Sequence, residues 1–190
     1  EPTVLSTLLC SASGVSDPDD EMVSLSYAWS VNGQTLEGEE TPALSDAFAK
    51  GESVRCTITP SDEKGPGEPK TSTPLIITNT LPLISSVSLS PSPASVCSTL
   101  TCEAGEVIDP DDDATVLAYR WERNEGELSA NTKTLELSDL TPGDTFRCSA
   151  SASDGTITGA GLIQGPEVQS ELVTIENLPP QIEGTSISPE

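Results

Sequence analysis

Two short runs of carboxylates offer the most evident chemistry in this sequence. One is Asp17-Pro-Asp-Asp-Glu21 and the other is Asp109-Pro-Asp-Asp-Asp113, and each is followed later by a Ser-Asp pair, at Asp62 and Asp154. Carboxylates are hard oxygen ligands, which favour Ca²⁺ over zinc or copper. Neither run is an EF-hand, because the required Gly and the twelfth-position Glu are absent. The plainer alternative is that Asp-Pro and Asp-Asp form turns on solvated loops.

The rest of the composition excludes several other kinds of chemistry. The 190 residues contain 31 Asp and Glu, 8 Lys and Arg and no His, for a formal net charge of −23. Without His there is no Ser-His or Cys-His nucleophile pair, so we expect no enzyme activity within these residues. The negative charge argues against nucleic acid and anionic membranes as partners. No apolar run is long enough to insert into a membrane.

The carboxylate runs belong to an internal repeat. Val4–Cys10 matches Val96–Cys102, and Gly51–Cys56 matches Gly143–Cys148, each 92 residues further along the chain. The second copy then gains six residues around Gly161–Pro166, and later matches are 98 residues apart. A repeat of this length indicates a tandem array of similar domains.

The repeat predicts three segments. Residues 1–82 form a first domain that lacks its first strand, residues 83–180 form a second domain, and residues 181–190 resemble the first strand of a following repeat. In particular, Thr185-Ser-Ile-Ser-Pro189 copies Val87-Ser-Leu-Ser-Pro91. We therefore expect either a window on a longer array, without a signal peptide, or a subunit that lends its last strand to the next subunit.

Each copy reads as a β-sandwich. Leu25, Tyr27 and Trp29 alternate with polar residues, as expected of a half-buried strand. Asn32-Gly33 then predicts a hairpin turn, and its counterpart Asn124-Glu-Gly126 predicts a turn one residue longer. No segment has a helical period, so the predicted fold class is all-β.

The order Cys, Trp, Cys is the most specific feature of both copies. In each, the Trp lies 19 residues after the first Cys and 27 residues before the second. This spacing and the Asp-Pro-Asp, Tyr-x-Trp and Ser-Asp segments resemble the bacterial immunoglobulin-like and cadherin-like tandem repeats of large extracellular surface proteins. The resemblance implies tandem immunoglobulin-like sandwiches, each with a disulfide between its two sheets.

The cysteines fit that fold. Four of them allow three pairings, and the repeat favours the pairing within each copy, Cys10 with Cys56 and Cys102 with Cys148. Disulfides imply an oxidising, extracellular compartment, although reduced buried cysteines in a cytosolic protein are the alternative. Cys97 has no counterpart, because Leu5 occupies that position in the first copy. We expect Cys97 to be a buried free thiol, with an intermolecular disulfide or a partner in a neighbouring repeat as alternatives.

The resemblance also implies where the acidic loops lie. In an immunoglobulin-like sandwich these loops share one end of the domain with the Ser-Asp loop and with the entering chain. Cadherin junctions bind Ca²⁺ with a similar set, so the resemblance implies a stiffening Ca²⁺ site, with Glu52 and Asp144 as acids at the far end of each domain. The candidate ligands are Asp17, Asp19, Asp20, Asp62, Asn79, Asp109, Asp111, Asp112, Asp113 and Asp154.

Three functions are compatible with these features. The first is a structural module of an extracellular tandem array, a stalk or filament on a cell surface, whose partners are neighbouring repeats of the same or an identical chain. The second is an adhesin that recognises a glycan or protein through domain-end loops, such as the insertion at Gly161–Pro166. The third is an accessory module of a secreted enzyme.

Overall fold

The structure consists of strands and loops. The computed structural model describes residues 1–19, 21–158, 161–181 and 184–186. Asp20, one of the predicted ligands, lies outside these ranges, as do residues 182–183 and 187–190 of the predicted last segment. Within the described ranges, no helix is long and apolar enough to cross a membrane.

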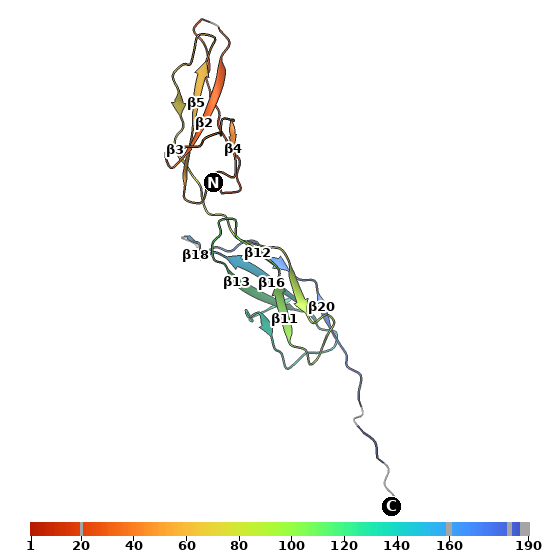
Figure 1. The fold of residues 1–190 in the computed structure, drawn as a ribbon. Coiled ribbons are helices and arrows are strands. Elements are labelled where there is room, and N and C mark those ends of the chain that lie inside the picture. The colour runs from red at the N-terminus through yellow and green to blue at the C-terminus, as the bar shows by residue number, and fades with distance from the viewer. Residues whose placement is uncertain (20, 159–160, 182–183, 187–190) are drawn as a thin grey trace, which may run out of the picture. The chain divides into compact units, whose positions relative to one another are not determined.

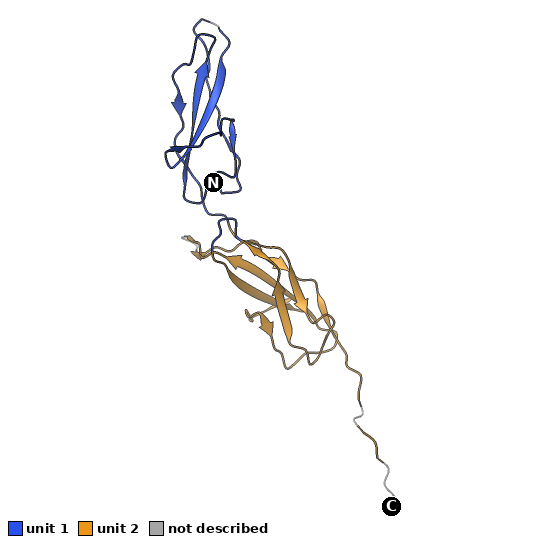
Figure 2. Cartoon of the chain, viewed as in Figure 1, with its two compact units in different colours: residues 1–80, 109–113 blue, residues 81–108, 114–190 orange. Residues whose placement is uncertain are grey.

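The chain forms two compact units, drawn in different colours in Figure 2. Unit 1 contains residues 1–80 and 109–113, and unit 2 contains residues 81–108 and 114–190. The acidic loop 109–113 connects two strands of unit 2 but is grouped with unit 1. The predicted domain limits at residues 82 and 180 stay predictions.

Unit 1 has two sheets, whose longest strands are labelled in Figure 1. Its strands are β1 (Leu8–Leu9), β2 (Ser24–Val31), β3 (Gln34–Thr35), β4 (Ala43–Leu44), β5 (Ser53–Ser61), β6 (Lys70–Thr71) and β7 (Leu75–Ile76). One sheet has the order β3-β2-β5-β6, with β7 also paired to β5, and the other is β1-β4. The Cys10–Cys56 disulfide joins the two sheets, since Cys10 directly follows β1 and Cys56 lies in β5.

Unit 2 repeats this plan with additional strands. They are β8 (Leu83–Ile84), β9 (Val87–Ser90), β10 (Ala94–Ser95), β11 (Leu100–Ala104), β12 (Val107–Ile108), β13 (Val116–Arg123), β14 (Gly126–Leu128), β15 (Thr134–Leu135), β16 (Thr145–Ser153), β17 (Ile157–Thr158), β18 (Gly161–Leu162), β19 (Val168–Gln169) and β20 (Val173–Glu176). The larger sheet has the order β10-β20-β16-β13-β14, and β19 also pairs with β16. The facing sheet is β15-β11-β9, and the Cys102–Cys148 disulfide connects β11 to β16.

The two cores confirm the expected role of the Cys-Trp-Cys pattern. Trp29 lies opposite Cys56 in the β2–β5 register, and Trp121 lies opposite Cys148 between β13 and β16. Both tryptophans are buried, and each indole N–H donates to a backbone carbonyl, of Thr41 at 2.9 Å and of Thr132 at 2.8 Å. A buried indole N–H needs such a partner. The predicted all-β class, with tandem immunoglobulin-like sandwiches and both disulfides, is therefore confirmed.

The length of the second hairpin turn differs from the prediction. Asn32 and Gly33 both have positive φ and connect β2 to β3, as the sequence predicts. The second turn is not one residue longer, because Arg123 pairs with Gly126 and leaves only Asn124 and Glu125 between the strands. Both of these residues have positive φ, at 50° and 67°. Glu125 thus occupies the left-handed position that Gly33 fills in the first copy, so Gly126 is a strand residue.

Candidate cation site at the second acidic loop

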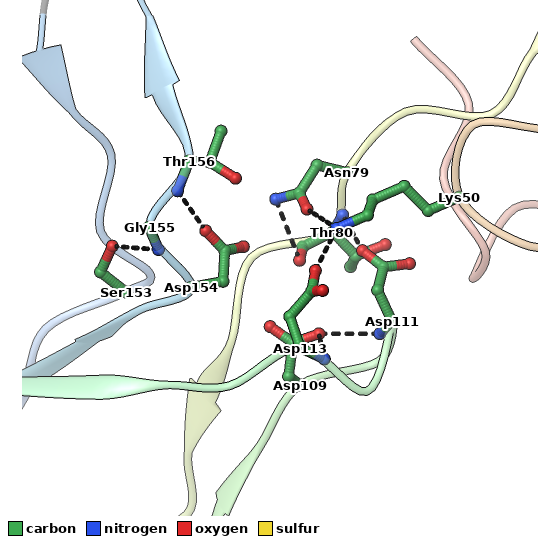
Figure 3. Close-up of polar contacts among 10 residues, drawn as sticks. All are labelled: Lys50, Asn79, Thr80, Asp109, Asp111, Asp113, Ser153, Asp154, Gly155 and Thr156. Carbon is green, nitrogen blue, oxygen red and sulfur yellow. Dashed lines mark hydrogen bonds and ion pairs between the residues drawn. The ribbon is translucent and has the colours of Figure 1, made fainter.

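The second acidic loop folds around one carboxylate. Asp109 Oδ1 accepts the backbone N–H groups of Asp111 at 2.8 Å and of Asp113 at 3.3 Å (Figure 3). The backbone N–H of Asp112 also donates to the Asp109 carbonyl, at 3.2 Å, and Asp112 has a positive φ. An Asp side chain that accepts a hydrogen bond from the backbone N–H two residues further along the chain forms an Asx-turn.

The first acidic loop has the same turn. Asp17 Oδ1 accepts the backbone N–H groups of Asp19 at 2.7 Å and of Glu21 at 3.3 Å. Asp62 likewise accepts two backbone N–H groups, those of Lys64 and Gly65, at 2.7 and 2.9 Å. In each loop, turn formation therefore accounts for the hydrogen bonds of one carboxylate oxygen, and these bonds need no metal ion to explain them.

Burial distinguishes the second loop from the first. Asp109 is only 9% exposed, whereas Asp19 is exposed and Asp17 is half-buried. Three buried oxygens near the second loop have no hydrogen-bond partner among the residues that the structure describes, namely Asp109 Oδ2, Asp111 Oδ1 and Thr80 Oγ1. Among the residues described in the first loop, no carboxylate oxygen is buried in this way. Buried oxygens without a partner are costly, so a ligand that contacts them would be stabilising.

These three oxygens belong to residues joined by hydrogen bonds. The backbone N–H of Thr80 donates to Asp111 Oδ2 at 2.6 Å, and Asp111 in turn donates its N–H to Asp109. One carboxylate oxygen of Asp109 and one of Asp113 lie within 4.8 Å of each other. The loop therefore presents several oxygens, most of them anionic, which suits a hard divalent cation.

Two lysines neutralise part of the negative charge on the loops. The Lys50 ammonium forms an ion pair with Asp113 and also donates to Asn79 Oδ1 at 3.0 Å (Figure 3). In the first loop, Lys64 forms an ion pair with Glu21, the residue that corresponds to Asp113. A lysine thus contacts the last carboxylate of each loop, which the sequence comparison does not reveal because neither lysine recurs.

The predicted ligands around the second acidic loop divide between the two units. Asn79, Asp109, Asp111 and Asp113 all lie in unit 1, whereas Asp112 is exposed. Asp154 belongs to unit 2, where its Oδ1 accepts the backbone N–H of Thr156 at 2.7 Å. Thr80 was not predicted, and only its position directly after Asn79 could have suggested it.

Glu52 and Asp144, the acids expected at the far end of each domain, both accept hydrogen bonds within their own unit. Glu52 accepts hydrogen bonds from Asn32 Nδ2 and from the backbone N–H of Ala49. Asp144 accepts from Asn124 Nδ2 at 2.8 Å, from Arg123 at 2.6 Å and from the N–H of Thr141 at 2.9 Å. The Asn124 and Arg123 hydrogen bonds lower the pKa of Asp144 from 3.8 to about 2.

Cys97 is a free thiol, but it is exposed rather than buried. The prediction of burial was wrong because it relied on the apolar character of Leu5, which is itself 67% exposed. An apolar residue at a surface position is common and does not indicate a core position.

No family model matches the chain, and no curated protein matches it. Solved structures with partial similarity include the chicken CNTN1 FN1–FN3 domains, with 11% identity, a TM-score of 0.38, and coverage of 87% of this chain and 61% of that one.

Two further structures have similarly low scores. The three N-terminal domains of the bacteriophage RB49 Hoc protein have 16% identity, a TM-score of 0.33, and coverage of 90% of this chain and 53% of theirs. Sidekick-1 immunoglobulin domains 1–5 have 17% identity, a TM-score of 0.27, and coverage of 91% and 38%. This chain spans less than two thirds of each of the three matched chains. The fold assignment therefore rests on the strand order within each unit.

Proposed function

We propose that this chain is a structural, non-catalytic module of an extracellular tandem immunoglobulin-like array, a stalk or filament on a cell surface. The observation that carries the proposal is the parallel pairing of the first and last strands of the larger sheet. Ala94 of β10 pairs with Ile175 of β20 in a parallel register. In unit 1, the backbone N–H and the hydroxyl of Thr78 both donate to the Pro2 carbonyl, at 2.7 and 2.9 Å.

Parallel end strands resist a pulling force. A force applied along the chain draws the two strands in opposite directions, so their hydrogen bonds are loaded together rather than broken one after another. An antiparallel pair pulled from one end would instead open bond by bond. The geometry of unit 2 therefore supports a role in carrying tension.

The disulfides limit how far each unit extends. Cys10–Cys56 and Cys102–Cys148 each join residues 46 positions apart, so force bypasses the enclosed chain. Disulfides persist in oxidising compartments, which supports an extracellular location. The excess of negative charge favours solubility and mutual repulsion of neighbouring modules.

Single-molecule force spectroscopy tests this function. We expect two unfolding events when the chain is stretched from its ends, each releasing only the residues outside the disulfide loop. A reductant should add about 160 Å of extension per unit, from 46 residues at about 3.5 Å each. Smooth extension without distinct unfolding events would contradict a mechanical role.

We also propose that the second acidic loop binds Ca²⁺. The proposal is supported by the buried oxygens of Asp109, Asp111 and Thr80 that lack partners, together with the charge of Asp113. Ca²⁺ accepts six to eight oxygens in flexible geometry, which fits carboxylates and a hydroxyl on a loop. The Lys50 ammonium contacts Asp113, so it would compete with the ion. Asp154, from the Ser-Asp loop of unit 2, stays a predicted ligand.

The hairpin β17–β18 favours an adhesin as the second candidate. The larger second copy forms this hairpin, and Ile157 and Leu162 in it are 75% and 56% exposed. The corresponding region of unit 1 has only an isolated bridge between Ser61 and Pro66. Exposed apolar side chains on a loop suit a protein ligand better than a glycan. If this candidate is right, Ile157→Ser should reduce adhesion of chain-coated beads to cells without changing stability.

A further inference from the structure

Unit 1 contains a hollow of about 410 Å³ beside the turn between β2 and β3, here called the hairpin hollow. The hairpin contributes Val31, Asn32 and Gln34–Leu36 to its lining, and the segment before β5 contributes Ala47 and Glu52. All of these residues belong to unit 1. Glu52 is the charged residue among them, so the hollow presents a carboxylate.

The two units can be compared residue by residue at this place. The counterpart of Val31 in unit 2 is Arg123, 92 residues further along the chain. Val31 pairs with Gln34 across the first hairpin, and Arg123 pairs with Gly126 across the second, so both hairpins have the same register. The side chains of Val31 and Arg123 therefore start from equivalent points of the two units.

In unit 2 a guanidinium lies at this position. Arg123 donates to Asp139 Oδ2 at 3.0 Å, to the Asp139 carbonyl at 2.9 Å and to Asp144 Oδ2 at 2.6 Å. The Arg123 side chain is only 20% exposed, and its guanidinium carbon lies 5.8 Å from the centre of the Phe146 ring. Unit 2 thus contains a nearly buried guanidinium site with three acceptors.

Glu52 is held in the same way as its counterpart Asp144. Asn32 Nδ2 donates to Glu52 Oε1 at 3.0 Å, as the corresponding Asn donates to Asp144. The backbone N–H of Ala49 donates to Glu52 Oε2 at 2.7 Å. In unit 2 the corresponding N–H donates to the same Asp144 oxygen that accepts from Arg123. A carboxylate oxygen can accept more than one hydrogen bond, so Glu52 Oε2 retains capacity for a guanidinium N–H.

The backbone of unit 1 offers a second acceptor. Arg123 donates to the carbonyl of Asp139, whose counterpart is Ala47. The Ala47 carbonyl accepts no hydrogen bond from the residues that the structure describes. Two of the three acceptors of the Arg123 site therefore have counterparts in the hairpin hollow, and the Asp139 carboxylate does not.

The charge around the hairpin hollow favours a cation. Glu37 and Asp46 each adjoin a lining residue in the sequence, and the whole chain has a formal charge of −23. A guanidinium is a planar fork of donors that is more weakly hydrated than an ammonium, so it suits a carboxylate beside a carbonyl. A basic segment of a partner would complement this surface.

We propose that the hairpin hollow binds an arginine side chain of a partner protein. The guanidinium donates to Glu52 and to the Ala47 carbonyl, as Arg123 does to their counterparts in unit 2. The aliphatic part of the arginine packs on Val31 and Leu36. This interaction surface goes beyond the proposed mechanical role and does not depend on it.

NMR titration with a Gly-Arg-Gly peptide blocked at both ends tests the inference. We expect saturable shifts of the backbone amides of Asn32 and Glu52. The amides of Asn124 and Asp144 are an internal control and should not shift, because Arg123 already occupies their site. A peptide with citrulline in place of arginine is planar but uncharged and should not bind. No shift in unit 1, equal shifts in both units, or equal binding of the citrulline peptide would overturn the inference.

Matched substitutions separate the site from the general negative charge. Glu52→Gln should weaken peptide binding by about tenfold or more, because a hydrogen bond to a charged acceptor is lost. Asp46→Asn removes a nearby charge but no proposed acceptor, so it should leave the affinity almost unchanged. An equal loss for both variants would contradict a defined site.

Val31→Arg keeps Glu52 and supplies the guanidinium from the chain itself, as Arg123 does in unit 2. The variant should stay folded and should no longer bind the Gly-Arg-Gly peptide. It therefore tests the hairpin hollow even if Glu52→Gln does not fold. Peptide binding by Val31→Arg at the wild-type affinity would overturn the inference.

Discussion

At the scale of single residues, two loops of nearly identical sequence differ in how their carboxylates are used. Asp17 and Asp109 accept the same two backbone N–H groups, so turn formation shapes both loops. Among the residues that the structure describes in the two loops, the second loop alone adds buried oxygens without a partner. We therefore expect any Ca²⁺ affinity to depend on the second loop and not on the first.

Matched substitutions test this expectation. Asp111→Asn and Asp19→Asn remove the same charge at equivalent positions. Ca²⁺ at 100 times its dissociation constant should raise the free energy of unfolding by about 2.7 kcal/mol for the wild type and for Asp19→Asn. Asp111→Asn should lose most of this gain, as measured by urea unfolding in Ca²⁺ and in chelator. Equal gains for both variants, or no gain for the wild type, would contradict the site.

Asp144 predicts a specific pH dependence. Its pKa falls from 3.8 to about 2 on folding, so its carboxylate stabilises the fold above about pH 4, and this contribution disappears as the pH falls towards 2. The stability difference between wild type and Asp144→Asn should therefore shrink between pH 4 and pH 2. Urea midpoints across this range give the measurement, with the exposed Glu136→Gln as control. A difference that stays constant with pH would show that the Asp144 charge is not involved.

At the scale of elements, the two hairpin turns allow a comparison of the same turn with and without Gly at its second position. Asn32-Gly33 and Asn124-Glu125 have the same length and both need positive φ, but only the first has Gly at its second position. A residue with a side chain in this positive-φ conformation lowers the stability of the fold by about 1 kcal/mol relative to Gly. Glu125→Gly should therefore stabilise unit 2 by about 1 kcal/mol, and Gly33→Glu should destabilise unit 1 by a similar amount.

No atom lies within 4 Å of a Cβ added at Gly33, so the second effect would come from the backbone alone. Thermal unfolding of both variants checks the prediction. If Glu125→Gly were destabilising, a side-chain contact of Glu125 would have to outweigh the backbone effect.

The disulfides connect the sheets and should dominate stability. Replacing Cys102 and Cys148 by Ala should lower the free energy of unfolding by about 4 kcal/mol, because a loop of 46 residues is no longer closed in the unfolded chain. The same change at Cys10 and Cys56 should cost unit 1 a similar amount. Cys97→Ala is the control and should have little effect, since this thiol is exposed and free. Urea unfolding that shows no loss for either pair would contradict the loop-entropy argument.

The sequence predicts the fold better than the site. Trp29, Cys56 and their counterparts could be placed because spacing and alternation follow directly from strand geometry. The partners of the acidic loops could not, since Lys50 and Lys64 do not recur between the copies. Cys97 was misplaced for a related reason, as an apolar counterpart does not determine burial. A contact whose residue occurs in only one of the two copies cannot be found by comparing the sequences of the copies.

At the scale of the whole molecule, each unit has a disulfide between its sheets, and unit 2 adds a parallel pair of strands, β10 and β20. We expect these features to make the module resist tension. Its formal charge of −23 favours repulsion between neighbouring modules.

The most direct test compares two pulling directions on unit 2. The free thiol of Cys97 follows β10, so attachment at Cys97 and at the C-terminus leaves the β10–β20 pairing unloaded. Attachment at the two chain ends loads that pairing in shear. We predict a clearly higher unfolding force for attachment at the chain ends than for attachment at Cys97 and the C-terminus. Equal forces in the two directions would contradict the claim that the parallel end strands carry tension.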